Sequence, residues 1–295
     1  MPFWSHWLRR LKRMHGEQVK TEKTFPITYP VPTLQDIPYV FPKDLSEEDR
    51  LDFQHHVFYN MLGSHYVAPV RSPRHILDVG TGTGIWARTM CAIFPKAQVI
   101  GLDIADSEKA PTKPENYTFQ HGDILKGLPF PDNYFDFVHQ RMLVGAIPVL
   151  QWRQVIVELT RVAQRGGWIE LLETHDYVNA GPASKKFMNW GKEVFAKHGL
   201  DYTYIPHLDK DLAYAGLTNI TKRQLLVPVG QWGGGTGSLL ARDMLTIFPR
   251  LGTLYVSILP HLTKQEFDET VAVLPQEWET LHTQAEFFIF YGKKP

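Results

Sequence analysis

The segment ILDVGTGTG, residues 76–84, limits what this chain can fold into more than any other feature. An apolar run leads directly into three alternating glycines, Gly80, Gly82 and Gly84, and a helical pattern follows. Glycine allows a sharp backbone turn and a close approach of a ligand to the backbone. The free N–H groups at the start of the helix add polar contacts. The segment therefore predicts a strand, a tight turn and a helix, and the turn either binds a ligand or only reverses the chain.

Strand-like and helix-like segments alternate after this turn, which predicts an α/β fold with a doubly wound parallel sheet. Apolar runs that end in polar or glycine residues are interpreted as strands at 75–80, 97–104, 117–124, 135–142, 167–175, 219–230 and 285–294. Helical periodicity is interpreted as helices at 84–94, 152–163, 183–199 and 207–216, with helical character at 262–282.

The bulk composition fits one large domain of ordinary globular type. The 295 residues contain 31 Lys+Arg and 31 Asp+Glu, so no net field favours nucleic acid. A single cysteine, Cys91, cannot form an internal disulfide, and no apolar run reaches the ~18 residues that span a bilayer. We expect an N-terminal arm at 1–45, whose basic, aromatic start precedes a proline-rich stretch, a domain at 46–295, and a cytoplasmic location.

Polar residues follow consecutive predicted strands, where an open α/β sheet binds its ligand. Asp103 ends the second strand about 20 residues after the last glycine, the position of an acid that binds ribose hydroxyls. Asp123 and Ile124 follow the third strand and could bind and cover an adenine ring. These residues predict a nucleotide cofactor at this edge.

Two nucleotide-binding classes fit the glycines less well. A dinucleotide fingerprint needs a third glycine where this chain has Ile85, which counts against NAD. A P-loop needs Gly-Lys-Ser/Thr, which is missing after Gly84.

The motifs ILDVGTGTG, GLDI, HGDI, FDFVHQRML and GGWIEL together resemble the successive motifs of class I S-adenosylmethionine-dependent methyltransferases. The segments LDFQHHVFYNMLGSHYVAP and FFIFYGKKP are similar to the LaeA-like family, known from fungal secondary metabolism. The resemblance covers roughly residues 45–295. It implies a Rossmann-like seven-stranded sheet of order 3-2-1-4-5-7-6 with the last strand antiparallel, S-adenosylmethionine as cofactor and S-adenosylhomocysteine as product.

The resemblance also assigns cofactor contacts to positions of this sequence. Asp78 and the glycine loop would hold the methionine end, Asp103 the ribose, and Asp123 with Ile124 the adenine. Gln140 or Arg141 would lie beside the methionine or the reacting methyl. The full set of cofactor-binding residues expected here comprises Gln54, Tyr66, Asp78, Gly80, Thr81, Gly82, Gly84, Asp103, Ile104, Gly122, Asp123, Ile124, Gln140 and Arg141.

The predicted helix 49–62 carries adjacent histidines, His55 and His56. Neighbouring residues on a helix point about 100° apart, so the two cannot readily share a metal ion. No metal is expected. Gln54 instead falls within the apolar face, where an amide needs hydrogen-bond partners. Gln54, His55 and Tyr66 either form a lid over the cofactor, or Gln54 is a satisfied core amide and His55 a half-exposed histidine.

Three residues are candidates for a catalytic base: His55, Glu173 and His175. Glu173 and His175 lie at the end of the fifth predicted strand, on the expected substrate side, with His139 and Asp176 nearby. A Glu/His pair there could act as a base, and solvated loop residues would show the same spacing.

Segments 183–206 and 231–284 are expected to form a substrate-side cap and an insertion before the last strand. The aromatic-rich insertion either walls a substrate pocket or packs a homodimer. The favoured function is in-line methyl transfer to a small, apolar or aromatic natural product, without nucleic acid or a membrane span. The alternatives are a protein methyltransferase, which would need an open charged groove, and a regulatory protein that binds the cofactor without transferring methyl.

Overall fold

A computed structural model of the chain describes residues 47–105 and 113–295, so the expected arm at 1–45 lies outside the described residues. Seven strands form one sheet in the order β3-β2-β1-β4-β5-β7-β6. The strands are β1 His75–Val79, β2 Gln98–Asp103, β3 Tyr117–His121, β4 Phe135–Arg141, β5 Ala163–Val178, β6 Thr218–Pro228 and β7 Gln284–Lys293. β7 pairs antiparallel with both β5 and β6, and the remaining pairs are parallel. The predicted sheet is confirmed.

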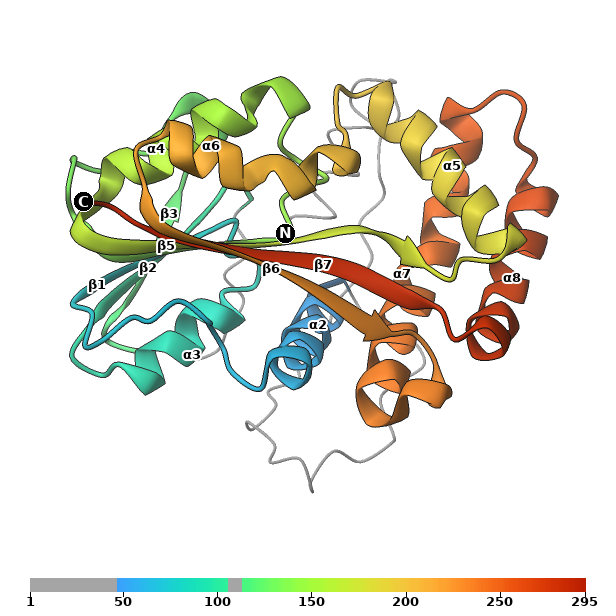
Figure 1. Ribbon diagram of the computed structural model, residues 1–295, viewed down its shortest axis with the longest axis horizontal. Coiled ribbons are helices and arrows are strands. Elements are labelled where there is room, and N and C mark those ends of the chain that lie inside the picture. The colour runs from blue at the N-terminus through green and yellow to red at the C-terminus, as the bar shows by residue number, and fades with distance from the viewer. Residues whose placement is uncertain (1–46, 106–112) are drawn as a thin grey trace.

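Helices cover both faces of this sheet, with α4 and α6 on one side and α2 and α3 on the other (Figure 1). The helices are α2 Glu47–Leu62, α3 Ile85–Ile93, α4 Trp152–Val162, α5 Pro182–Ala196, α6 Leu208–Tyr214, α7 Gly234–Ile258 and α8 Lys264–Leu281. Short 3₁₀ turns lie at Ile124–Lys126, Val149–Gln151, Tyr202–His207 and Gln231–Gly233. The central strands are buried on both faces, as the apolar runs of β1 and β4 require.

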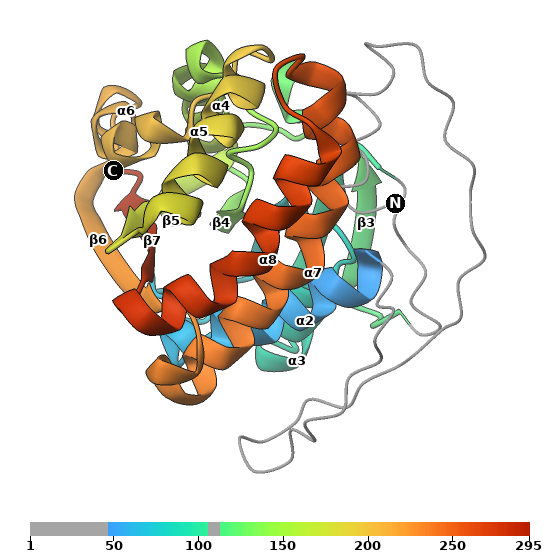
Figure 2. The same ribbon diagram turned by 90° about the vertical axis from the view of Figure 1, so that its right-hand side faces the viewer.

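A helical cap lies at one end of the sheet and consists of α5, α7 and α8 (Figure 1). Seen from that end, α7 and α8 run side by side and α2 lies beside α7 (Figure 2). Two hydrogen bonds from α2 to Asp243 of α7 join these helices across 193 and 189 residues of sequence. The insertion therefore belongs to the same end of the molecule as the helix that precedes β1.

Two local boundaries differ from the sequence-based expectation. α4 ends at Val162, and β5 begins at Ala163, four residues before the predicted strand. The glycine-rich segment 232–237 forms a 3₁₀ turn and the first turn of α7. Gly230 donates to the Gly237 carbonyl at 3.0 Å, and a Cβ on Gly237 would lie 2.4 Å from the Gly230 oxygen. These glycines therefore permit close backbone packing.

The turn after β1 depends on glycine conformation. Gly80, Gly82 and Gly84 have φ values of 71°, 58° and 76°, which L side chains rarely adopt. A Cβ on Gly80 would also lie 2.5 Å from Cδ2 of Leu143, in the loop after β4. The loops after β1 and β4 are thus packed directly against each other at the carboxyl edge of the sheet.

Within residues 47–105 and 113–295, no helix has both the length and the apolar character needed to cross a bilayer.

We predict that Gly80→Ala costs more stability than Gly63→Ala. Both glycines have positive φ, 71° and 65°, so each alanine is strained by about 1–2 kcal/mol. Only the new methyl at position 80 would displace a neighbour, because nothing lies within 4 Å of a Cβ on Gly63. Urea unfolding without ligand measures the difference, and equal losses would contradict the tight loop packing.

Candidate active site

A polar pocket lies at the carboxyl ends of β1 and β4, directly over the glycine loop. Its walls come from α2, the loop after β1, the start of α3 and the end of β4. The lining residues are Leu51, Gln54, Asp78, Gly80, Thr81, Gly82, Thr83, Ile85, Trp86, His139, Arg141 and Met142. We call this the cofactor pocket.

Asp78, the penultimate residue of β1, fixes two neighbours in the cofactor pocket. Its Oδ2 accepts from the Thr81 hydroxyl at 2.7 Å, and its Oδ1 lies 2.8 Å from Nδ1 of His139. A carboxylate only accepts, so Nδ1 of His139 carries the proton. The His139 ring stacks on Trp86 at a centroid distance of 3.7 Å. Burial lowers the pKa of His139 although the Asp78 hydrogen bond opposes the shift, which keeps the imidazole neutral at pH 7.

Asp103 ties the end of β2 to the glycine loop. Its Oδ2 accepts from the Gly82 N–H and its Oδ1 from the Ala105 N–H, both at 2.9 Å. Burial raises the pKa of Asp103 to about 6, although both backbone hydrogen bonds oppose the shift. Each carboxylate oxygen keeps a lone pair that can accept another hydrogen bond.

The residues expected around an adenine lie at the same edge but outside the lining of the cofactor pocket. Ile104 follows β2, and β2 pairs in parallel with β3, so Gly122, Asp123 and Ile124 follow at the neighbouring strand end. The Gly122 N–H donates to the Asp103 carbonyl at 2.9 Å. Asp123 caps a 3₁₀ turn by accepting from the Leu125 N–H at 3.0 Å.

Gln140 and Arg141 alternate across β4 and therefore lie in different surroundings. Arg141 lines the cofactor pocket, with its guanidinium carbon 4.6 Å from the centroid of Phe58. Burial lowers the pKa of Arg141 to about 10, so the side chain stays charged at pH 7. Gln140 is fully buried outside the pocket lining, and its Nε2 lies 3.5 Å from Glu173.

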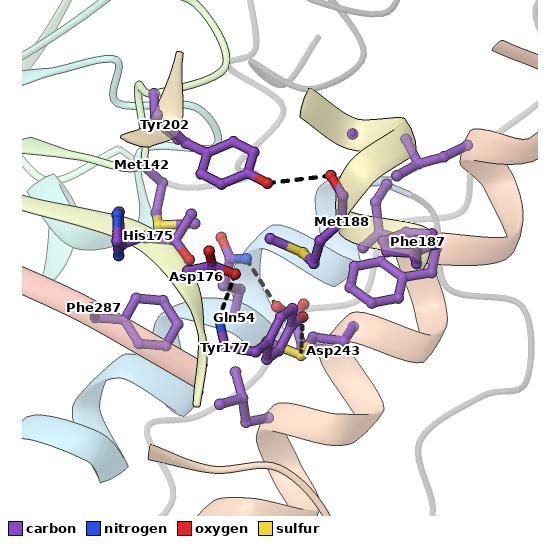
Figure 3. A pocket seen from close by; sticks show the side chains of 18 of the residues that line it. Gln54, Met142, His175, Asp176, Tyr177, Phe187, Met188, Tyr202, Asp243 and Phe287 are labelled. Carbon is purple, nitrogen blue, oxygen red and sulfur yellow. Dashed lines mark hydrogen bonds between the residues drawn. The ribbon is translucent and has the colours of Figure 1, made fainter. Parts of the chain in front are cut away.

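A second cavity, of about 160 Å³, lies beneath the helical cap. An apolar cavity of about 150 Å³ can hold a benzene molecule, so this space suits a small apolar compound or part of a larger one. Its walls come from α2, α5, α7 and the end of β5. They consist of Arg50, Gln54, Val57, Phe58, Met142, Val144, Thr174, His175, Asp176, Tyr177, Phe187, Met188, Gly191, Phe195, Tyr202, Leu240, Asp243, Met244, Ile247, Phe248, Leu251, Tyr255 and Phe287 (Figure 3). We call this the acceptor cavity.

The two cavities share two lining residues, Gln54 and Met142. Met142 has a left-handed backbone, with φ 58°, just after β4. Its N–H donates to Leu172 at 2.8 Å, and the next two N–H groups donate to the buried Glu173 carboxylate at 2.9 Å. Such a strained conformation persists when surrounding contacts fix it, as they do here.

Gln54 is held from the other side by α7. Its Nε2 donates to Oδ2 of Asp243 at 2.8 Å (Figure 3). The Arg50 guanidinium donates to Oδ1 of the same carboxylate at 2.9 Å. Arg50 and Asp243 are both buried. A further bond, from the Thr83 hydroxyl to Asp52 at 2.5 Å, joins α2 to the glycine loop. Helix α2 therefore contributes to both cavities and is fixed to both.

Two residues expected to act from the helix and its following loop line neither cavity. His55 stacks on His65 at 5.3 Å and accepts from Arg141 at 3.4 Å, and burial lowers its pKa well below the ordinary value. The Tyr66 ring packs against Phe94 and Phe137, at centroid distances of 5.9 and 5.7 Å.

Glu173 and His175, two of the expected bases, both lie on β5 but have different surroundings. Residues two apart on a regular strand share a face, but His175 lies where the register of β5 against β7 shifts, between Thr174 and Tyr177. Glu173 lines neither cavity, and burial raises its pKa to about 8, although it accepts two hydrogen bonds from the loop after β4 and one from Gln140 of β4. His175 lines the acceptor cavity and pairs through Nδ1 with Glu286 of β7, which also accepts from Gln224. The structure thus brings a His/Glu pair to the cavity, with Glu286 as the acid.

Sequence reasoning did not single out Arg50, Met142, Asp243 or Glu286. Asp243 left one signal, since an acid within the apolar stretch LLARDMLTIF must find a partner when buried. Glu286 and Met142 left none, because their partners come from distant strands. No group of three His, Cys, Asp or Glu side chains suited to a metal ion occurs in the part of the chain that the structure describes.

Comparison with known proteins identifies the family to which this chain is similar. The family described as "Methyltransferase domain" matches residues 76–167. The methyltransferase pytC of Aspergillus terreus is 32% identical over 206 residues, which are 66% of this chain and 62% of pytC. The secondary metabolism regulator LAE1 of Cochliobolus heterostrophus is 30% identical over 209 residues, which are 66% of this chain and 67% of LAE1. The chain thus spans less than two thirds of pytC.

The fold has a counterpart among solved structures. Phosphoethanolamine N-methyltransferase 2 of Haemonchus contortus, solved with phosphomonomethylethanolamine and S-adenosylhomocysteine, has a TM-score of 0.50 and 16% identity. The similarity covers 86% of this chain and 61% of that one and concerns the fold alone. With the sheet order, the glycine loop and the relatives taken together, this chain belongs to the class I S-adenosylmethionine-dependent methyltransferases, in the LaeA-like family.

Proposed function

We propose that this protein transfers a methyl group from S-adenosylmethionine to a small, apolar or aromatic molecule of secondary metabolism. The observation that carries the proposal is the meeting of a polar cofactor pocket and an apolar cavity at Gln54 and Met142. A methyl donor in one and an acceptor in the other would face each other there, as in-line displacement needs. Holding the two reactants in this geometry supplies much of the rate.

The residues of the cofactor pocket fit S-adenosylmethionine. Arg141 offers a cation for the methionyl carboxylate, and the glycine loop offers backbone N–H groups. Asp103 lies outside the pocket lining but is bonded to Gly82 of that loop, and it offers acceptors for ribose hydroxyls. When bound, the cofactor supplies a methyl group activated by a positively charged sulfur. Gln54, Asp78, Gly80, Thr81, Gly82, Gly84 and Arg141 would contact its methionine half, with Gln140 and Tyr66 behind them, and Ile104, Gly122, Asp123 and Ile124 its adenosine half.

The acceptor cavity would exclude water from the reaction and would supply a base. Apolar side chains from α5 and α7 close the space above Met142. Nδ1 of His175 faces Glu286, which leaves Nε2 as the nitrogen that can take a proton from a hydroxyl or amine. Glu286 would stabilise the protonated ring. His175 is therefore the proposed base, and Glu173 and His55 keep structural roles.

A second candidate function is binding of the cofactor by a regulator without methyl transfer, because one relative is named a secondary metabolism regulator. An apolar cavity beside the cofactor pocket favours an enzyme over this alternative. The apolar lining likewise favours a small molecule over a protein side chain delivered through a charged groove. A cytoplasmic location and a homodimer stay predictions from the sequence.

Asp103 gives a pH-dependent prediction. Its pKa of about 6 means that the carboxylate, the form that accepts ribose hydroxyls, is lost on acidification. We expect affinity for S-adenosylhomocysteine to fall below pH 6 by about tenfold per pH unit. Asp103→Asn should bind more weakly and without this pH dependence. Calorimetry between pH 7.5 and 5 measures both, and a flat wild-type profile would contradict the assignment.

Blocking the acceptor cavity tests the proposed reaction. Gly191 lies on α5 in the cavity wall, where a Cβ meets only the Tyr255 hydroxyl at 3.4 Å. Gly191→Leu would fill the space, and we expect methyl transfer to fall at least about tenfold while S-adenosylhomocysteine still binds. Gly191→Ala is the matched control and should lose less.

Labelled S-adenosylmethionine incubated with an organic extract of the host's metabolites provides the readout. Label should appear in extractable small molecules that mass spectrometry can identify. Transfer by Gly191→Leu at the wild-type rate would show that the acceptor binds elsewhere.

A further inference from the structure

The Gln54 amide stands where the two cavities meet, and its orientation follows from the chemistry of its partner. A carboxylate can only accept hydrogen bonds, so the amide group that faces Asp243 must be the NH₂ group. The 2.8 Å contact joins Nε2 of Gln54 to Oδ2 of Asp243 accordingly. The carbonyl oxygen, Oε1, is therefore directed away from Asp243 (Figure 3).

The Asp243 carboxylate is held in its role as the hydrogen-bond acceptor for Gln54. Its second oxygen accepts from Arg50, whose guanidinium stays protonated in proteins and carries donors only. Both side chains are almost fully buried, with 1% and 6% of their surfaces exposed. The ion pair therefore fixes a charged acceptor beside Gln54 and forces the same orientation on the amide whenever α2 and α7 are packed together.

The junction offers few other groups that can recognise a polar atom. Met142, the other residue shared by the cavities, presents a thioether, which accepts hydrogen bonds only weakly. The Gln54 carbonyl is a strong acceptor, and no residue in 47–105 or 113–295 donates a hydrogen bond to it. A hydroxyl or amine can donate to it, whereas a carbon nucleophile cannot.

We propose that Oε1 of Gln54 accepts a hydrogen bond from the O–H or N–H group that is methylated, and that Asp243 acts as its positioning residue. This inference rests on the proposed function and narrows it, since the acceptor would be an apolar molecule with a protic nucleophile. The bond orients the nucleophile and leaves a lone pair directed toward the cofactor side. In the transfer, a bond would form from the nucleophile to the methyl carbon as the bond from that carbon to the sulfur breaks. The proton would leave its hydrogen bond with Gln54 and pass to Nε2 of His175, so Gln54 itself takes no proton.

Three probes of nearly equal shape test the proposal without knowledge of the natural substrate. They are para-fluorophenol, para-fluoroaniline and para-fluorotoluene, titrated into full-length protein saturated with S-adenosylhomocysteine and followed by fluorine NMR. The wild type should bind the phenol and the aniline about tenfold more tightly than the toluene, which is the usual value of one hydrogen bond.

Gln54→Met keeps the length of the side chain and removes the carbonyl, so the preference for the two donors should fall to about one. Asp243→Asn should also reduce the preference, because the Gln54 amide can then turn over. A general loss of packing would instead weaken the binding of all three probes equally. Thermal unfolding checks that each variant is folded. Because Gln54→Met leaves the Arg50–Asp243 pair intact, it decides the question even if Asp243→Asn does not fold.

Tyr177→Phe is the matched control, since its hydroxyl contacts Met244 within the same cavity at 3.3 Å and it should keep the preference. A preference that persists in Gln54→Met, or that disappears in Tyr177→Phe or His175→Phe instead, would overturn the proposal. Binding of the probes to Gly191→Leu distinguishes failure of the Gln54 inference from failure of the proposed function. If it leaves all three probes bound, they do not occupy the acceptor cavity. If it expels them while Gln54→Met keeps the preference, only the Gln54 inference fails.

Discussion

The carboxylate of Asp243 is the contact on which the arrangement of the site depends. It receives Arg50 and Gln54 from α2 while standing on α7, so one buried side chain joins the helix before the sheet to the insertion before the last strand. Breaking a buried ion pair by removing one partner typically costs about 3–5 kcal/mol, because the other charge is left uncompensated. Without this contact, α2 would lose its place as the wall that the cofactor pocket and the acceptor cavity share.

The two cavities draw on different parts of the fold. The cofactor pocket is built from the carboxyl ends of β1 and β4, where Asp78 and Arg141 are fixed by the most buried strands. The acceptor cavity lies beneath the cap, between α5, α7, α2 and the end of β5, and many of its lining side chains are aromatic or methionine. Glu173 connects them, since it holds the loop that carries Met142 in its left-handed conformation. The polar cofactor pocket suits a cofactor that is the same for every acceptor, and the lining of the apolar acceptor cavity can vary with the acceptor.

Individual residues show which parts of the fold and the site could be predicted from the sequence alone. The sheet order and the glycine loop followed from local patterns and a family resemblance, because strands, turns and helices have short-range signals. Gln54 was recognised as an amide in need of a partner, yet its partner lies 189 residues away, a pairing that periodicity does not encode. Glu173 and His175 had the same sequence signal, yet Glu173 holds the backbone of the loop after β4, while His175 lies in the register shift of β5 against β7 and lines the acceptor cavity. Glu286 became visible only through the pairing of β5 with β7.

The central claim is that the transferable methyl lies where the two cavities meet. A crystal structure of the protein with S-adenosylmethionine tests it most directly. The account predicts that the methyl carbon points into the opening between Gln54 and Met142, with the methionine end over the glycine loop and beside Arg141. A methyl group that points to solvent, or into a wall closed off from the acceptor cavity, would contradict it.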